Sequence, residues 1–147
     1  MILAALTAAA LLHLPAADHE PQPSRAQVSR ISAAASLPPK GWAAFARCVE
    51  HRESKGHASI VNRSSGAAGL FQFMPAWRHG LPYMVAHRLH THGMSKGQAS
   101  AIRKDLSSKP IQRWPDVYQR VGFAEVIAQG GWRHWTGGHG CNALASR

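Results

Sequence analysis

Apolar and polar positions repeat with a helical period over residues 41–54, GWAAFARCVEHRES. The positions that fall on one face at this spacing are Trp42, Phe45, Ala46, Val49 and Glu53. Gly56 follows as a natural helix stop. The pattern therefore predicts a helix whose apolar face ends at a carboxylate.

Two further stretches predict helices. PDVYQRVGFAEVIAQGG, residues 115–131, places apolar side chains on one face and ends at paired glycines. Its face residues are Val117, Val121, Ala124 and Ala128. KGQASAIRKDL, residues 96–106, predicts a shorter helix.

The stretches between these helices are less regular. SIVNRSSGAAGLFQF, residues 59–73, has β-branched and aromatic residues around a small-residue turn and predicts a short hairpin or an irregular loop. In residues 75–93, Pro75 favours a helix start, but Gly80 and Pro82 predict a break soon afterwards. The expected fold class is α+β, mostly helical, with a small β or turn element.

Composition divides the chain into three parts. Residues 1–17, MILAALTAAALLHLPAA, are apolar and end at small residues, which predicts a secretory signal peptide or an apolar leader. Residues 18–40 are rich in Pro, Ser, Ala and Gln and predict a linker. Residues 41–147 are then the folded domain. We expect the protein to be secreted or held in the cell envelope, monomeric, and without stable insertion into a membrane.

The net charge indicates classes of binding partner, and the two cysteines bear on the cellular compartment. Against 17 Lys and Arg residues stand 7 acidic ones, which gives a formal net charge of +10. Such a surface favours polyanions, among them nucleic acid, anionic lipid and the acidic polymers of a cell envelope. Cys48 and Cys141 form an even pair, which predicts one disulfide in an exported domain and two free thiols in a cytoplasmic one.

Glu53 is the candidate for chemistry. A carboxyl at a helix C-terminus and against an apolar face has two reasons to stay protonated, namely desolvation and the negative end of the helix dipole. A neutral carboxylic acid is what a glycosidic bond needs as a general acid. After Glu53 come a turn of small residues, an amide at Gln72 and a tryptophan at Trp77.

These residues resemble the lytic transglycosylases, a lysozyme-like family. The resemblance is carried by RES at 52–54 and by SSGAAGLFQFMPAW at 64–77, which is similar to the family's Gly-Ala-x-Gly-Leu-x-Gln turn followed by Met-Pro. It is greatest for the actinobacterial branch that includes the resuscitation-promoting factors. In that branch a cysteine precedes the glutamate, as in CVEHRES, and a second closes the domain, as in FAEVIAQGGWRHWTGGHGC. The resemblance covers residues 42 to 141.

The resemblance implies a function and a set of site residues. The function is cleavage of the β-1,4 bond between N-acetylmuramic acid and N-acetylglucosamine in peptidoglycan, with a 1,6-anhydro product. Glu53 would be the single acid and base, no cofactor or metal would be needed, and Cys48 would pair with Cys141. The expected substrate-binding residues are Gln72, Ser65, Asn62, Tyr118 and Trp132. The expected partners are peptidoglycan strands and anionic wall polymers, not nucleic acid.

Three alternatives stay open at this stage. A hydrolysing muramidase, such as a lysozyme or a phage lysin, would use the same fold with a second carboxylate. A wall-binding domain would keep the fold without turnover. A basic nucleic-acid-binding protein would show a steep dependence of affinity on salt. The histidines lack the HExxH spacing of a zinc site, so we expect them at the surface.

Overall fold

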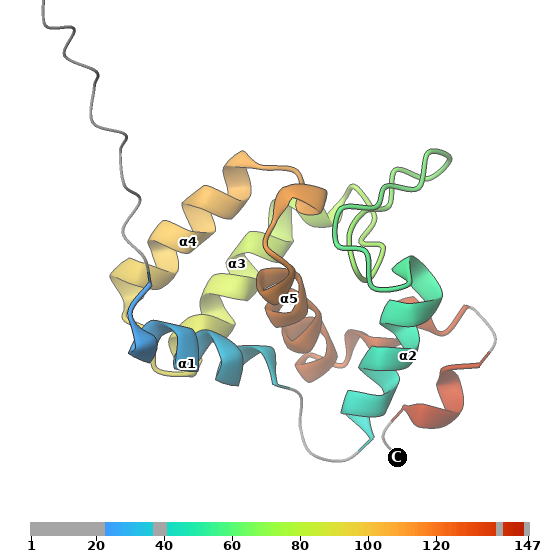
Figure 1. Cartoon of the computed structure of the whole chain (residues 1–147), viewed down its shortest axis with the longest axis horizontal. Coiled ribbons are helices and arrows are strands. Elements are labelled where there is room, and N and C mark those ends of the chain that lie inside the picture. Colours follow the sequence, from blue (N-terminus) through green and yellow to red (C-terminus); the bar gives the residue numbers. More distant parts are fainter. Residues whose placement is uncertain (1–22, 37–40, 138–139, 146–147) are drawn as a thin grey trace, which may run out of the picture.

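The computed structural model describes residues 23–36, 41–137 and 140–145. The predicted leader at 1–17 lies outside the described residues, as do the two ends of the predicted linker. The described part is mostly helical, as the sequence predicts (Figure 1). Its helices are α1 Arg25–Ala35, α2 Trp42–Ser54, α3 Trp77–Thr91, α4 Lys96–Ser108 and α5 Asp116–Ala128. Three short 3-10 segments follow or link them: η1 Ile111–Arg113, η2 Gly131–Trp135 and η3 Asn142–Leu144.

Helix α5 runs through the middle of the molecule, with α1, α3 and α4 to one side of it and α2 to the other (Figure 1). Every residue from Val121 to Ile127 is buried, so the second half of α5 is enclosed on all sides and not on one face alone. Gly122 allows α3 to approach closely, because a Cβ there would lie 3.1 Å from the Cδ1 atom of Leu81.

Helix α3 is continuous through Gly80 and Pro82, so the predicted break is wrong. Pro82 removes one backbone donor near the start of the helix. Burial outweighs that loss, because Pro82 is buried along with Leu81, Val85 and Leu89. Packing of a buried face usually decides helix stability over intrinsic propensity.

Residues 25–35, which the sequence assigns to a linker, form helix α1 and pack against α3 and α5. Ser24 begins the helix with a capping box, in which its hydroxyl and the Gln27 side chain each accept a backbone N–H. Ile31 and Ala34 are buried against the core. The folded unit therefore begins before residue 41, and the prediction of a linker over this segment is corrected.

A buried ion pair fastens the end of α1. Arg88 of α3 donates hydrogen bonds to the carbonyls of Ala34 and Ser36, the latter at 2.7 Å, and lies 3.4 Å from a carboxylate oxygen of Glu125. Burial acts to raise the pKa of Glu125, but hydrogen bonds from Gln129, His87 and Arg88 outweigh it and hold that pKa below its ordinary value. Glu125 is therefore a structural carboxylate.

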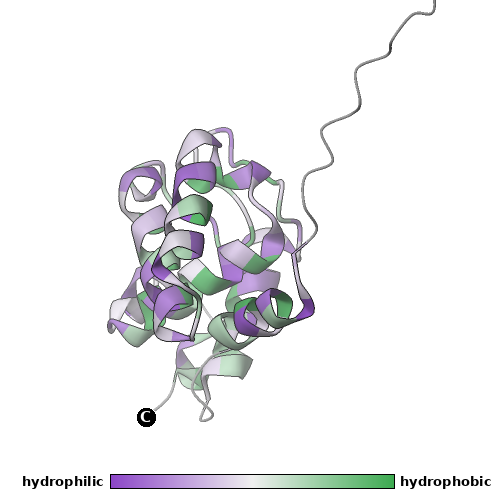
Figure 2. Cartoon of the chain, turned by 90° about the vertical axis from the view of Figure 1, so that its left-hand side faces the viewer, coloured by the Kyte–Doolittle hydropathy of each residue, from purple (hydrophilic) through white to green (hydrophobic). Residues whose placement is uncertain are grey.

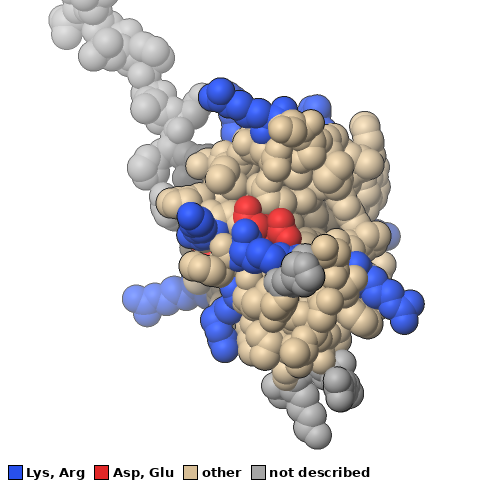
Figure 3. Space-filling view, turned by 90° about the vertical axis from the view of Figure 1, so that its right-hand side faces the viewer, with Lys and Arg blue, Asp and Glu red and all other residues tan. Residues whose placement is uncertain are grey.

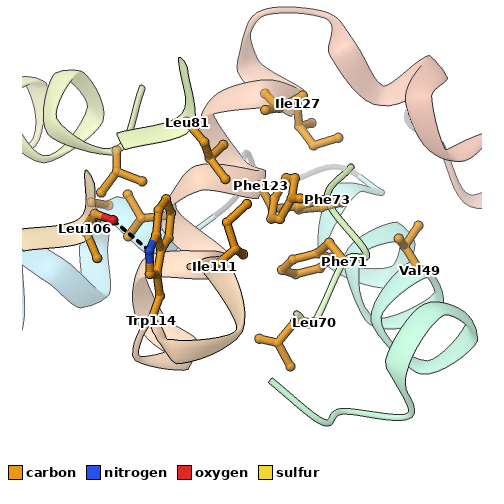
Figure 4. Packing of buried hydrophobic residues seen from close by; sticks show 14 of the residues in the cluster. Val49, Leu70, Phe71, Phe73, Leu81, Leu106, Ile111, Trp114, Phe123 and Ile127 are labelled. Carbon is orange, nitrogen blue, oxygen red and sulfur yellow. Dashed lines mark hydrogen bonds between the residues drawn. The ribbon is translucent and has the colours of Figure 1, made fainter. Parts of the chain in front are cut away.

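The core is continuous and rich in aromatic side chains (Figure 4). Phe71 stacks on Phe123 with ring centroids 3.9 Å apart. The Trp114 indole donates to the Leu106 carbonyl at 3.0 Å, which satisfies its polar atom in the core. Figure 2 shows hydrophilic and hydrophobic residues alternating around the outer helices, as expected when each buries one face.

The connection between α2 and α3, residues 55–76, is called the α2–α3 loop. Instead of a regular hairpin it holds two isolated antiparallel bridges, Val61 with Ala68 and Ala68 with Phe73. The β part of the expected α+β class is reduced to these bridges in the described residues. Cys48 of α2 and Cys141 are joined by a disulfide. None of the described helices combines the length and the apolar character needed to cross a membrane.

Candidate functional site

Glu53 stands in the last turn of α2, where the sequence places it. Phe45 and Val49 anchor the helix in the core, and Lys55 ends it in the left-handed conformation with φ of 53°. The Glu53 side chain keeps 26% of its surface exposed. The carboxylate is therefore rigidly placed at the edge of the core and open to a ligand.

The immediate surroundings of Glu53 are more polar than the sequence predicts. Arg52 donates from Nε at 3.0 Å and from Nη2 at 2.6 Å to Oε1 of Glu53, the next residue along the helix. Neighbouring residues on a helix do not normally face each other, so the apolar face gave no sign of this pair. The carboxylate is thus held in one orientation by a charged hydrogen-bond donor.

Trp135 connects Glu53 to the α2–α3 loop. Its carbonyl accepts a hydrogen bond from Nη2 of Arg52 at 2.7 Å, and its indole donates to the carbonyl of Phe71 at 2.7 Å. The ring is buried and lies edge-on to Phe73, at a centroid distance of 5.8 Å. One buried residue of η2 therefore contacts both the partner of Glu53 and the two neighbours of Gln72.

Gln119 of α5 also holds the α2–α3 loop in place. It is fully buried, accepts the backbone N–H of Leu70 at 2.7 Å and donates to the carbonyls of Ala58, Ile111 and Trp114. Gly69 makes this possible, because its φ is +80° and a Cβ would lie 2.2 Å from Oε1 of Gln119. The glycine in the motif is required by close packing against an amide.

Gln72, the predicted binding amide, lies in the turn that these contacts hold. Its φ of 50° is unusual for a residue other than glycine. Its Nε2 donates to the Gly69 carbonyl at 3.1 Å, and the side chain is partly exposed. A residue held in a sparsely populated conformation and open to solvent is the type of feature found at ligand sites.

Asn62 and Ser65, also predicted to bind substrate, build the tip of the loop. Oδ1 of Asn62 accepts from the backbone N–H groups of Ser64 and Ser65, and Oγ of Ser65 accepts from that of Ala67. These are local turn contacts of the kind that short polar side chains make. Both residues remain exposed at the loop surface.

Tyr118 is not part of the group formed around Glu53. It lines a hollow of about 600 Å³ whose other walls come from α1, α4 and the start of α5, including Ile31, Ile102 and Asp105. Burial, with a smaller contribution from the Asp105 charge, raises the pKa of Tyr118 above its ordinary value.

Trp132 lies at the opposite end of α2 from Glu53. Its ring packs against Trp42 with centroids 6.5 Å apart, and the Arg133 guanidinium lies over it at 5.4 Å. Trp42 and Glu53 are eleven positions apart in α2, which is about 16 Å along a helix. The structure therefore does not bring Trp132 together with Glu53 and Gln72.

The other described carboxylates are each engaged elsewhere. Glu50 forms a two-armed ion pair with Arg120, with one contact at 2.8 Å. Asp105 pairs with Lys109 at 2.6 Å, Asp116 accepts the N–H of Val117 at the start of α5, and Glu125 is buried with Arg88. Within the described residues, no group of three His, Cys, Asp or Glu side chains is arranged to hold a metal ion.

Sequence reasoning did not single out Arg52, Trp135 and Gln119 as the residues that build this site. Each acts through backbone atoms that are far away in the sequence or, for Arg52, through an adjacent residue. In comparisons with protein families, with curated proteins and with solved structures, none matches this chain. The case for a function therefore rests on the motif residues and the geometry around Glu53.

Proposed function

We propose that the chain is a peptidoglycan lytic transglycosylase of lysozyme-like fold in which Glu53 is the only acid and base. The observation that carries this proposal is the link through Trp135. Its carbonyl contacts Arg52, which holds Glu53, and its indole contacts Phe71, which precedes Gln72. The two separate halves of the motif, RES and GLFQF, are thereby tied to one buried residue, through its backbone carbonyl and its indole.

The proposed reaction uses one carboxyl twice. Glu53 donates a proton to the glycosidic oxygen as the bond between that oxygen and the anomeric carbon of N-acetylmuramic acid breaks. The substrate's N-acetyl group stabilises the positive charge that develops on the sugar. Glu53, now a carboxylate, removes the proton of the muramyl 6-hydroxyl as its oxygen bonds to the anomeric carbon. The products are a 1,6-anhydro sugar and a free 4-hydroxyl, and no water is consumed.

The surroundings of the other acids favour this one-carboxyl scheme over hydrolysis. Ordinary glycosidases need a second carboxyl at a defined separation from the first. Glu50 is the described acid closest to Glu53 in the sequence, one turn earlier on α2, and both its oxygens are taken by Arg120. Glu53 is also paired with an arginine, but Arg52 bonds only its Oε1. Among the described residues, Glu53 therefore keeps an oxygen for the substrate, whereas Glu50 does not.

The remaining site residues have unequal support. Gln72 is proposed to hydrogen-bond the substrate, since it lies in the fixed turn next to Phe71 and is partly exposed. Asn62 and Ser65 are proposed to shape the loop, with sugar contacts as a second role. Trp132 and Tyr118 would meet only distant parts of a long strand. Export to the cell envelope, as a monomer, fits the proposed substrate.

The first experiment compares Glu53→Gln with Glu50→Gln, because both variants make the same chemical change on the same helix. Purified peptidoglycan is digested, and the soluble fragments are analysed by mass spectrometry. We expect anhydromuramyl fragments from the wild type and from Glu50→Gln, at a rate reduced less than tenfold in the latter. Glu53→Gln should lose at least about a hundredfold, as expected when a general acid is removed.

Each other outcome has a distinct meaning. Fragments with reducing ends would replace the lyase by a muramidase. Equal loss in both variants would make Glu50 a second catalytic carboxyl and point the same way. If the protein binds peptidoglycan without releasing fragments, and Glu53→Gln binds equally well, the chain is a wall-binding domain and not an enzyme.

A further inference from the structure

Helix α2 carries basic side chains on its solvent-facing side, and at helical spacing Glu50 lies between them and Glu53. Arg47 and His51 lie one turn apart on one side of α2, and Lys55 follows at its C-terminal end. All three are exposed. Figure 3, which looks onto the side of the molecule where α2 lies, shows a small acidic patch surrounded by Lys and Arg side chains.

These basic side chains border a hollow in the surface. The hollow has a volume of about 330 Å³ and is lined by Arg47, Glu50, His51, Lys55, Gly56 and Arg120. Arg120 comes from α5, so two helices build the hollow. The one acid in it, Glu50, is already neutralised by Arg120, and Arg47 and Lys55 therefore leave a net positive charge.

The basic side chains at the hollow are available to a ligand. Among the contacts of the described residues, the side chains of Arg47, His51 and Lys55 make no ion pair or hydrogen bond. By contrast, the nearby Arg52 and Arg120 are committed to Glu53 and Glu50. The Glu50–Arg120 pair forms a fixed wall against which an anion can be oriented.

The hollow lies close to the candidate acid. Glu50 lines it, and Glu53 follows Glu50 by three positions on α2, which places the two Cβ atoms about 5–6 Å apart. His51 and Lys55 point away from Glu53 at helical spacing, so a polymer bound across Glu53 would reach the hollow with a side group that extends past Glu50. The glycan backbone of peptidoglycan is neutral, while its peptide branches end in carboxylates and its attached polymers carry phosphates.

We infer that this hollow, formed by Arg47, His51, Lys55 and the Glu50–Arg120 pair, is a binding site for an anionic group of the wall polymer, a carboxylate or a phosphate. The inference rests on the proposed function for the identity of the polymer. The site adds recognition of a charged branch to cleavage of the neutral strand. It selects strands that still carry their anionic groups.

The experiment measures binding to insoluble walls by sedimentation, in the Glu53→Gln background so that the ligand is not cut. The test variant adds Arg47→Gln and Lys55→Gln. The matched control adds Lys96→Gln and Lys104→Gln, which make the same change of charge on exposed residues of α4, on the far side of the molecule (Figure 1). A third variant, Arg47→Lys with Lys55→Arg, keeps the charge.

We expect the test variant to bind intact walls about fivefold more weakly, as the loss of two exposed charged contacts predicts. The matched control should change by less than twofold, and the charge-keeping variant should bind as the parent does. An equal loss in the test variant and the α4 control would overturn the site in favour of general attraction by net charge. No loss in the test variant would overturn it as well.

Treated walls identify the anionic group. Amidation with a carbodiimide and methylamine neutralises the wall carboxylates without cutting the polymer, and hydrofluoric acid removes the phosphodiester polymers. The difference between parent and test variant should disappear after one of the two treatments, which names the carboxylate or the phosphate. A difference that survives both treatments would overturn the inference.

The proposed function can fail independently of this site. Fragments from the wild type together with equal wall binding by parent and test variant would refute the hollow and keep the enzyme. Wall binding that depends on Arg47 and Lys55, without fragments from the wild type, would keep the hollow and refute the enzyme. Absence of both binding and fragments would refute both.

Discussion

Gln119 and Gln72 have different roles in one loop. Gln119 is fully buried, and its amide is shared among one backbone donor and three carbonyls, which come from the α2–α3 loop and from the connection between α4 and α5. The side-chain amide of Gln72 makes one hydrogen bond, to the carbonyl of Gly69, and the side chain remains partly exposed. The buried amide therefore determines where the loop lies, while the exposed one is available to a ligand.

Replacing Gln119 by leucine should destabilise the protein by about 3 kcal/mol or more. The change leaves the Leu70 N–H and the carbonyls bonded by Nε2 without partners in the core, and each such buried group costs about 1–3 kcal/mol. Urea unfolding followed by circular dichroism measures this. Gln112→Leu is the control, because Gln112 lies in η1 with its side chain only half-buried. Equal stability of the two variants would contradict the role given to Gln119.

At the scale of elements, local patterns predicted the helices that carry a clear signal of their own. Helices α2, α4 and α5 show apolar residues at helical spacing or clear stops, and the structure has all three. For α3 and α1, the deciding contacts come from other helices. Leu81 packs at Gly122 of α5, and the carbonyls at the end of α1 are bonded by Arg88 of α3.

The site follows the same rule. Glu53 and Gln72 could be chosen from the sequence because they stand in a motif with defined spacing. Arg52, Trp135 and Gln119 act on backbone atoms or on a neighbouring side chain. A contact to a backbone atom leaves no sign in the sequence, because every residue carries the same backbone groups. Tyr118 and Trp132 stand in no such motif: Tyr118 is expected from the family resemblance, as a tyrosine late in the domain, and Trp132 from its place near the closing cysteine. The structure places them near other elements, Tyr118 beside α1 and α4 and Trp132 against Trp42.

Substitutions in helix α1 test whether this helix is part of the core. Ile31→Ala should destabilise the protein by about 2 kcal/mol or more, because Ile31 is buried against the core and its loss leaves a cavity. Val28→Ala is the control on the same helix, since Val28 is 52% exposed, and we expect at most about 0.5 kcal/mol for it. Thermal unfolding of both variants measures the difference. Similar small losses in both would show that α1 is an appendage.

At the scale of the whole molecule, the C-terminal segment closes the fold over α2. It contributes Trp135, which holds Arg52 and the α2–α3 loop, and Cys141, which is bonded to Cys48. The cysteines are 93 positions apart, so the disulfide joins the two ends of the proposed catalytic domain. Stability and the geometry at Glu53 are therefore expected to depend on the same covalent link.

The double variant Cys48→Ser with Cys141→Ser should lose about 4 kcal/mol of stability, since a loop of this length strongly restricts the unfolded chain. At a temperature where the variant stays folded, we expect its release of peptidoglycan fragments to slow more than tenfold, because Trp135 is then less firmly held against Arg52 and Phe71.

Thermal unfolding and fragment release are measured with and without a reducing agent. The wild type should shift towards the variant when reduced, and the variant should not change. Full fragment release by a folded variant would separate the disulfide from the site and leave Trp135 held by its hydrogen bonds and ring contacts alone.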